Sequence, residues 1–162
     1  MEYTVCYIAD EAFASLIACL DAELAQRYGA GQDAYQPHNV IEAGEAIVAS
    51  EDGEPVGCGC FRPCDAAAVE IKRMYVKPEY RGRGVARALL AQLEKRAAAL
   101  GYRSAVLETG YKQLEAIRLY EKSGYERIPN YGPYADIPDS VCFRKILGEA
   151  DLTASIARSS DA

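Results

Sequence analysis

The sequence predicts a single α+β domain with a central mixed, mostly antiparallel twisted sheet of about seven strands flanked by helices. The chain has 162 residues, half of them apolar, which suits one domain with one core. Seven short runs rich in β-branched and aromatic residues are interspersed with three amphipathic helical segments. No internal repeat or linker interrupts them. We therefore expect one domain over residues 1–147 and a flexible C-terminal tail over residues 148–162.

The N-terminal part predicts a strand followed by an amphipathic helix. Residues 3–8 are β-branched and aromatic, and Asp10 can cap the helix after them. Gly29 and Gly31 end that helix. Its apolar residues recur at spacings of three and four and are Phe13, Leu16, Ile17, Leu20 and Leu24.

The middle of the chain predicts a hairpin and a long central strand. Residues 46–50 and 56–61 flank Asp52-Gly53, a strong hairpin signal. Residues 68–76 form the next strand. Strict alternation along it places four side chains on one face, unless a bulge shifts the parity. These four are Glu70, Lys72, Met74 and Val76.

The best-defined helix covers residues 84–100, and Gly101 ends it. The strand before it and the strand after it should pair in parallel through a right-handed crossover. The apolar stripe of the helix consists of Val85, Ala86, Leu89, Leu90, Leu93, Ala97 and Leu100. The remaining predicted elements are a strand at 104–109, a helix at 114–123, a strand at 125–128, a turn-rich loop at 130–139 and a strand at 141–146.

Composition excludes several classes of function. The net charge of −6 argues against nucleic-acid binding, and no apolar run reaches the roughly 20 residues that a membrane span needs. The N-terminus has no basic flank or long apolar run, so we expect no signal peptide and six reduced cysteines in a cytoplasm. Cys58-x-Cys60-x-x-x-Cys64 invites a metal interpretation, but its spacing favours core or edge-strand thiols and no metal.

A loop between the 68–76 strand and the following helix has the composition of an anion site. Arg81-Gly82-Arg83-Gly84 precedes the first turn of the helix, and Arg87 lies within that turn. Free N–H groups and the dipole favour an anion there, and glycine permits close approach. The spacing matches neither G-x-x-x-x-G-K-[ST] nor G-x-G-x-x-G. The alternative is a glycine turn with solvated arginines.

Arg81-x-x-Gly84-x-Ala86 resembles the [RQ]-x-x-G-x-[GA] signature of the GCN5-related N-acetyltransferases (GNAT). Glu70-Ile71 before the loop and the segment 119–125 after it extend the resemblance over about residues 46–147. It implies that loop amides hold the pyrophosphate of acetyl-CoA and that the preceding strand end also contacts the coenzyme. The expected coenzyme-binding residues are Met74, Tyr75, Val76, Arg81, Gly82, Arg83, Gly84, Val85, Ala86, Arg87, Gln113 and Tyr120. Gln113 stands where many relatives have asparagine.

The resemblance also implies catalytic roles. Glu70 is a candidate general base, often acting through water in the family, and Glu108 on the next strand competes for that role; both could otherwise be structural carboxylates. A backbone N–H at the Met74 to Val76 strand end would stabilise the thioester oxyanion. Tyr120 would act as general acid toward the coenzyme sulfur, with a core tyrosine as the alternative.

The sequence therefore predicts an acetyl-CoA-dependent N-acetyltransferase that acts directly on a small-molecule amine in a ternary complex. Residues 107–110 and 132–143 resemble a bacterial subgroup of small-molecule acetyltransferases. A non-catalytic acyl-CoA-binding sensor is the alternative, and a monomer or a homodimer would fit either.

The first helix, the loop around residues 28–38 and the 131–139 loop should wall the acceptor site. The first loop carries Tyr28 and Tyr35, and the second carries Tyr131 and Tyr134. Asp136 and Asp139 would draw a cationic amine, whereas Arg127 would bind a substrate carboxylate. His38, the only histidine, could act in the acceptor site but is expected to be a solvated loop residue.

Overall fold

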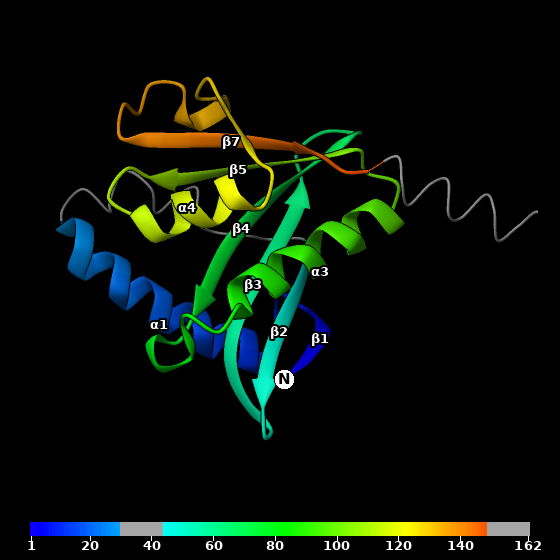
Figure 1. The fold of residues 1–162 in the computed structure, drawn as a ribbon, viewed down its shortest axis with the longest axis vertical. Coiled ribbons are helices and arrows are strands. Elements are labelled where there is room, and N and C mark those ends of the chain that lie inside the picture. Colours follow the sequence, from blue (N-terminus) through cyan, green and yellow to red (C-terminus); the bar gives the residue numbers. More distant parts are fainter. Residues whose placement is uncertain (30–43, 149–162) are drawn as a thin grey trace, which may run out of the picture.

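The fold is a seven-stranded sheet with the order β1-β2-β3-β4-β5-β7-β6 (Figure 1). A computed structural model describes residues 1–29 and 44–148 of the chain. The strands are β1 (Glu2–Tyr7), β2 (Glu45–Glu51), β3 (Glu54–Pro63), β4 (Ala68–Val76), β5 (Ser104–Gly110), β6 (Glu126–Ile128) and β7 (Ser140–Ile146). The helices are α1 (Glu11–Tyr28), α3 (Val85–Ala99) and α4 (Leu114–Lys122), with short 3-10 turns η2 (Pro78–Tyr80) and η3 (Gly132–Tyr134).

These elements confirm the predicted fold class and its predicted order of strands and helices. Most boundaries differ from the prediction by one or two residues, and β4 has the predicted bounds. Asp10 caps α1 by accepting from the Ala12 and Phe13 N–H groups, and Gly29 ends it with φ 54°. Gly31, Tyr35 and His38 lie outside the described residues, as does the predicted tail beyond residue 148.

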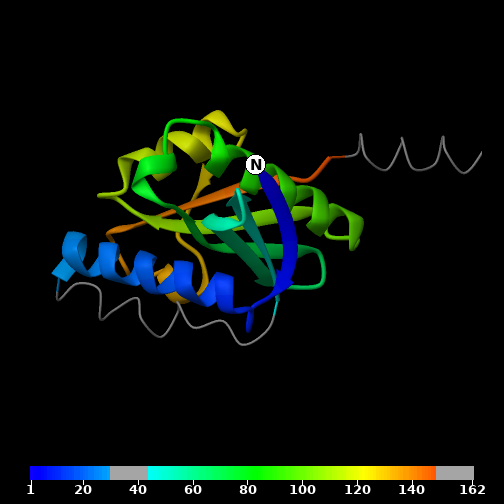
Figure 2. The same cartoon turned by 90° about the horizontal axis from the view of Figure 1, so that it is seen from below.

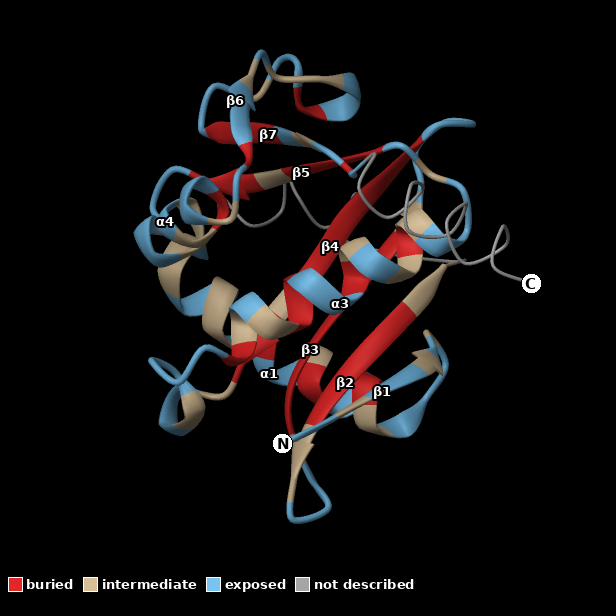
Figure 3. Cartoon of the chain, turned by 45° about the vertical axis from the view of Figure 1, so that its right-hand side comes forward, coloured by how far each residue is buried: buried red, intermediate tan, exposed pale blue. Residues whose placement is uncertain are grey.

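The sheet is covered on both faces, which gives two cores. Helix α1 packs on one face through Phe13, Leu16 and Leu20, whereas α3 and α4 lie on the opposite face (Figure 2). The larger core is formed on the α3 side by residues such as Leu89, Leu90 and Leu93. The buried residues of the central strands lie between these layers (Figure 3).

Strands β4 and β5 are the only parallel neighbours among the described strands, and they pair over a short distance. Their register runs from Ala68 opposite Ser104 to Ile71 opposite Leu107 and extends no further. Strand β5 continues to pair with β7 as far as Gly110 opposite Ser140. The ends of β4 and β5 therefore diverge and leave a V-shaped gap in the sheet.

A β-bulge in β4 corrects the expectation of strict alternation. Opposite β3 the register shifts between Cys58, paired with Tyr75, and Cys60, paired with Lys72. Arg73 lies in the bulge with φ 59°, an uncommon conformation for a residue other than glycine. The thiols of Cys58 and Cys60 donate to the carbonyl oxygens of Arg73 and Lys72, at 3.5 and 3.3 Å.

Beyond the bulge, the side chains of β4 lie on the opposite faces of the sheet from those that strict alternation would give them. Val69 and Ile71 belong to the α3-side core, and so do Val76 and the packed side chain of Met74. Tyr75 belongs to the α1-side core instead. Glu70 and Lys72 therefore do not share a face with Met74 and Val76, contrary to the unbulged expectation.

Gly59, opposite the bulge, leaves room for Met74 on the α3 side. A Cβ atom at Gly59 would lie 2.4 Å from Met74 Sδ and 2.8 Å from Leu93 Cδ1. We predict that Gly59→Ala lowers the free energy of unfolding by about 1–3 kcal/mol through overpacking. Urea denaturation should show a smaller loss in a Met74→Ala background, because one clashing side chain is absent. Equal losses in the two backgrounds would contradict this contact.

Candidate functional site

A cavity of about 460 Å³ opens where β4 and β5 diverge. It brings together most of the residues that the sequence singled out, from the arginine–glycine loop to both candidate bases and Tyr120. Its lining includes Leu20, Leu24, Arg27, Tyr28, Glu70, Lys72, Met74, Tyr75, Val76, Arg81, Gly82, Gly84, Val85, Ala86, Arg87, Glu108, Gln113, Tyr120 and Tyr134.

The arginine–glycine loop forms one end of this cavity. Gly82 and Gly84 have φ values of 77° and 80°, and no atom lies within 4 Å of a Cβ built at either position. Gly84 is the N-cap of α3 and makes no side-chain cap hydrogen bond, so no side chain at the cap satisfies the first N–H groups of that helix. The loop therefore has the backbone conformation and open space that an anion needs.

The three arginines of this loop have different partners. Arg81 is held in place, because its Nε donates to the Val76 carbonyl oxygen at 2.8 Å and its Nη2 pairs with Glu23 at 2.9 Å. Arg83 lies 3.6 Å from Glu51. Arg87 is exposed, lines the cavity and makes no ion pair with a described residue. Arg87 is thus the best placed of the three to meet a bound anion.

The end of β4 presents backbone groups to the gap. Lys77 N–H donates to Val56 of β3, so the alternation of a strand turns the N–H and carbonyl of Val76 toward the diverged side. Arg81 accounts for the Val76 carbonyl. The Val76 N–H therefore points to the side where β5 no longer pairs.

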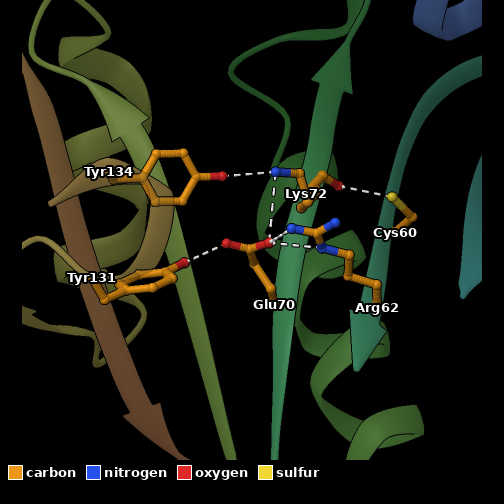
Figure 4. Close-up of polar contacts among 6 residues, drawn as sticks. All are labelled: Cys60, Arg62, Glu70, Lys72, Tyr131 and Tyr134. Atoms are coloured by element: carbon orange, nitrogen blue, oxygen red, sulfur yellow. Dashed lines mark hydrogen bonds and ion pairs between the residues drawn. The ribbon is translucent and has the colours of Figure 1, made fainter. Parts of the chain in front are cut away.

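Glu70 is buried and held by three neighbours (Figure 4). Its Oε1 accepts from Arg62 Nε at 3.0 Å and lies 3.6 Å from Lys72 Nζ, while its Oε2 accepts from the Tyr131 hydroxyl at 2.6 Å. Both oxygens of this carboxylate are therefore engaged. Arg62 was not singled out from the sequence, because its position opposite Glu70 depends on the register between β3 and β4.

Glu108 lies on β5 and differs from Glu70 in its surroundings. Its Oε1 is buried without a hydrogen-bond partner among the described residues. The pKa of Glu108 is raised from 4.5 to about 7, chiefly by burial; the Ser140 hydrogen bond and the charge of Lys72 lower it, and the charge of Glu70 raises it. Glu108 is thus a carboxyl group poised to exchange a proton near neutral pH.

Tyr120 lies on α4, buried against Tyr125 and Phe143 at ring-centroid distances of 5.8 and 6.0 Å. Its side chain nevertheless lines the cavity. Burial and the charge of Glu108 raise the pKa of Tyr120 well above its usual range, so its hydroxyl stays protonated. Tyr120 is therefore a core residue that also lines the cavity.

The wall opposite α4 comes from α1 and from η3. Leu20, Leu24 and Tyr28 of α1 line the cavity, and so does the buried Tyr134 of η3. Arg27 pairs with Glu115 at 3.3 Å and so joins the last turn of α1 to the first turn of α4. Four residues considered for the acceptor site do not line this cavity: Arg127, Tyr131, Asp136 and Asp139.

Two further properties concern the described part of the chain. Within residues 1–29 and 44–148, no group of three or more His, Cys, Asp or Glu side chains is arranged to hold a metal ion. Cys58 and Cys60 are buried and Cys64 is exposed. None of the described helices combines the length and the apolar character that a membrane span requires.

Comparison with known proteins gives consistent matches. Residues 11–125 match the acetyltransferase (GNAT) family. An IAA acetyltransferase of Azospirillum brasilense is 38% identical over 102 residues, covering 62% of this chain and 67% of that protein. The chain thus spans about two thirds of that relative.

Solved structures have the same fold. A candidate acyl-CoA N-acyltransferase from Klebsiella pneumoniae has a TM-score of 0.74 and 34% identity, covering 90% of this chain and 98% of that chain. A GNAT family acetyltransferase from Elizabethkingia anophelis, solved with acetyl-CoA bound, has a TM-score of 0.64 and 20% identity, with coverages of 90% and 98%. At that identity the second likeness concerns the fold alone.

The raised pKa of Glu108 predicts a pH dependence of stability. The native carboxyl takes up its proton near pH 7 and the unfolded one near 4.5, so the native state binds more protons between these values. Stability should therefore fall as pH rises through this window, by an amount on the order of 1–3 kcal/mol. Urea denaturation from pH 4 to 8 should show that Glu108→Gln removes this fall. Glu121→Gln, an exposed control on α4, should retain it; a Glu108→Gln profile parallel to wild type would refute the shift.

Proposed function

The chain belongs to the acetyltransferase (GNAT) family, and on that premise we propose that it transfers an acetyl group from acetyl-CoA directly to the amine of a small molecule. The observation that carries the proposal is the meeting of three features in one cavity. These are the open helix N-terminus at Gly84, the buried carboxyl of Glu108 and the protonated hydroxyl of Tyr120.

We place the coenzyme pyrophosphate on the backbone N–H groups of residues 81–86. Gly82 and Gly84 keep side chains away from this loop, and Arg87 adds a positive charge without an ion pair among the described residues. The pantetheine arm would then run along the diverged end of β4, past Gln113. The Elizabethkingia protein with the same fold was solved with acetyl-CoA bound, which supports this donor.

For the general base we favour Glu108 over Glu70. A free amine attacks a thioester and an ammonium does not, so the acceptor must first lose a proton. With a pKa of about 7, Glu108 is a stronger base than an ordinary glutamate by between about two and three powers of ten. Both oxygens of Glu70 already accept hydrogen bonds, one from Arg62 and the other from Tyr131, and Lys72 lies 3.6 Å away. We assign Glu70 to positioning these neighbours.

The remaining steps use the backbone and Tyr120. The amine nitrogen bonds to the thioester carbon, and the Val76 N–H stabilises the negative charge that develops on the carbonyl oxygen. The carbon–sulfur bond then breaks, and Tyr120 gives its hydroxyl proton to the departing sulfur. The nitrogen loses its second proton as the amide forms, and that proton restores the Tyr120 hydroxyl. Glu108 holds the proton taken from the ammonium before the attack and releases it to solvent.

A non-catalytic acyl-CoA sensor is the second candidate function. The loop at Gly84 serves a sensor equally well. A sensor has no use, however, for a carboxyl that titrates near neutral pH beside the acyl site. Glu108 therefore favours the enzyme.

The first test of this proposal concerns the loop. We predict that Gly84→Val weakens acetyl-CoA binding by roughly tenfold or more, because the side chain blocks approach to the amides. Each tenfold loss of affinity corresponds to about 1.4 kcal/mol of binding free energy. Isothermal titration calorimetry measures the affinity. Gly53→Val is a matched control, since Gly53 also has a positive φ of 81° and open space but does not line the cavity. Unchanged affinity in folded Gly84→Val would contradict the binding of the coenzyme at this loop.

The second test separates the two carboxylates by their pH–rate profiles. Glu108→Gln should lower kcat/KM by roughly 100- to 10,000-fold and abolish the rise in rate near pH 7. Glu70→Gln should lower activity and stability while keeping that rise, because it disturbs the Arg62 and Lys72 pairing. CoA release from acetyl-CoA, measured with a thiol reagent from pH 5.5 to 9, gives both profiles. A rise that disappears in Glu70→Gln and persists in Glu108→Gln would reverse the assignment.

A further inference from the structure

Lys72 and Glu108 are the first residues beyond the last paired rung of β4 and β5. That rung joins Ile71 to Leu107, so an amine group and a carboxyl group flank the point where the strands diverge. Both residues line the cavity, and each affects the charge state of the other. Their immediate neighbours Ile71 and Leu107 belong to the α3-side core, so Lys72 and Glu108 face the α1 side together.

The Lys72 side chain is 7% exposed, and its acidic neighbours are Glu70 and Glu108. Its Nζ donates to the Tyr134 hydroxyl at 2.8 Å and lies 3.6 Å from Glu70 Oε1 (Figure 4). Arg62 shares the same Glu70 oxygen at 2.9 Å. Two cations therefore share the Glu70 carboxylate. A lysine ammonium has three donors, of which Tyr134 takes one and Glu70 faces a second.

We propose that Lys72 binds the carboxylate of the acceptor and that the acceptor is an α-amino acid. The inference rests on the proposed acetyl transfer at the same cavity. The acceptor's carboxylate takes the third donor of Lys72, and its amino group lies beside Glu108. A zwitterion thus matches the two side chains, carboxylate to ammonium and amine to carboxyl.

The third donor of Lys72 separates this acceptor from a simple amine. An amine without a carboxylate has no acceptor to offer that donor when its nitrogen lies beside Glu108. An amino acid offers its carboxylate, and charge-assisted hydrogen bonds are the strong ones in such sites. Burial lowers the pKa of Lys72, whereas the charges of Glu70 and Glu108 raise it. Arg127, considered earlier for this role, is exposed on β6 and does not line the cavity.

The experiment compares acceptors that share a side chain and an amino group and differ in the carboxylate, with kcat/KM expressed per free amine because the carboxylate also changes the pKa of the amino group. L-leucine, L-leucinamide and 3-methylbutylamine, together with the corresponding phenylalanine series, are assayed by CoA release at pH 8. We expect kcat/KM of the wild-type protein to be roughly 10- to 100-fold higher for the amino acid than for its amide, as one charged hydrogen bond provides. Equal rates for the acid, amide and amine would overturn the inference while leaving acetyl transfer intact.

Variants then locate the preference. Lys72→Met should raise KM for the amino acid and bring its kcat/KM close to that of the amide, with little change in acetyl-CoA affinity. Lys72→Arg should keep part of the preference because it keeps the charge. Lys122→Met, an exposed lysine at the end of α4, is the matched control and should behave like wild type. A preference that survives in folded Lys72→Met would overturn the role of Lys72.

Calorimetry gives a readout that does not require catalysis. Binding of L-leucine and of L-leucinamide, and of the phenylalanine pair, is measured on the CoA-loaded protein. Tighter binding of the acids without acetyl transfer would contradict the proposed enzyme and keep the carboxylate site. Acetyl transfer to amines without preferential binding of the acids would contradict the carboxylate site and keep the enzyme. If Lys72→Met does not fold, the wild-type comparison of acid, amide and amine still decides.

Discussion

The divergence of β4 and β5 beyond the Ile71–Leu107 rung is the constraint on which the site depends. A continuous sheet would satisfy its backbone groups internally and leave no space between strands. Here β5 follows β7, while β4, bulged at Arg73, stays with β3. The Val76 N–H, Lys72 and Glu108 thereby reach one cavity from two strands, and α3 begins beside it.

Two glutamates in this cavity show how pairing decides the chemistry of a buried carboxylate. Glu70 accepts hydrogen bonds from Arg62 and Tyr131 and lies 3.6 Å from Lys72, so both of its oxygens are engaged. Glu108 is buried, with one oxygen lacking a partner among the described residues. Its pKa is therefore about 7, and its neutral form is favoured below that pH. Glu70 therefore positions its neighbours, whereas Glu108 can accept and release a proton.

The sequence predicted the fold class, the order of the elements and the glycine loop from local patterns, such as turn glycines, helical periodicity and strand composition. The grouping of that loop with Glu108 and Tyr120 was implied by the resemblance to the GNAT family and by no local pattern. The bulge at Arg73 was not predictable, because a β-bulge adds one residue without a compositional mark. The pair of Arg62 with Glu70 was missed because it depends on the register between β3 and β4, and the pair of Arg73 with Asp21 because it depends on how α1 packs against the bulged strand. Arg81 matches the motif, but its side chain donates hydrogen bonds to the Val76 carbonyl oxygen and to Glu23.

The thiols of Cys58 and Cys60 lie on β3, the neighbour of β4, and donate to the two carbonyl oxygens at the bulge. Burial raises the pKa of Cys60 to about 12 and raises that of Cys58 further. Acetyl transfer liberates coenzyme thiol, which an oxidant can convert to the coenzyme disulfide, and a cysteine attacks that disulfide as its thiolate. With almost no thiolate at neutral pH, these two cysteines are slow to form mixed disulfides with the oxidised coenzyme. The hydrogen bonds that hold the bulge in shape therefore also keep its sulfur atoms out of redox chemistry.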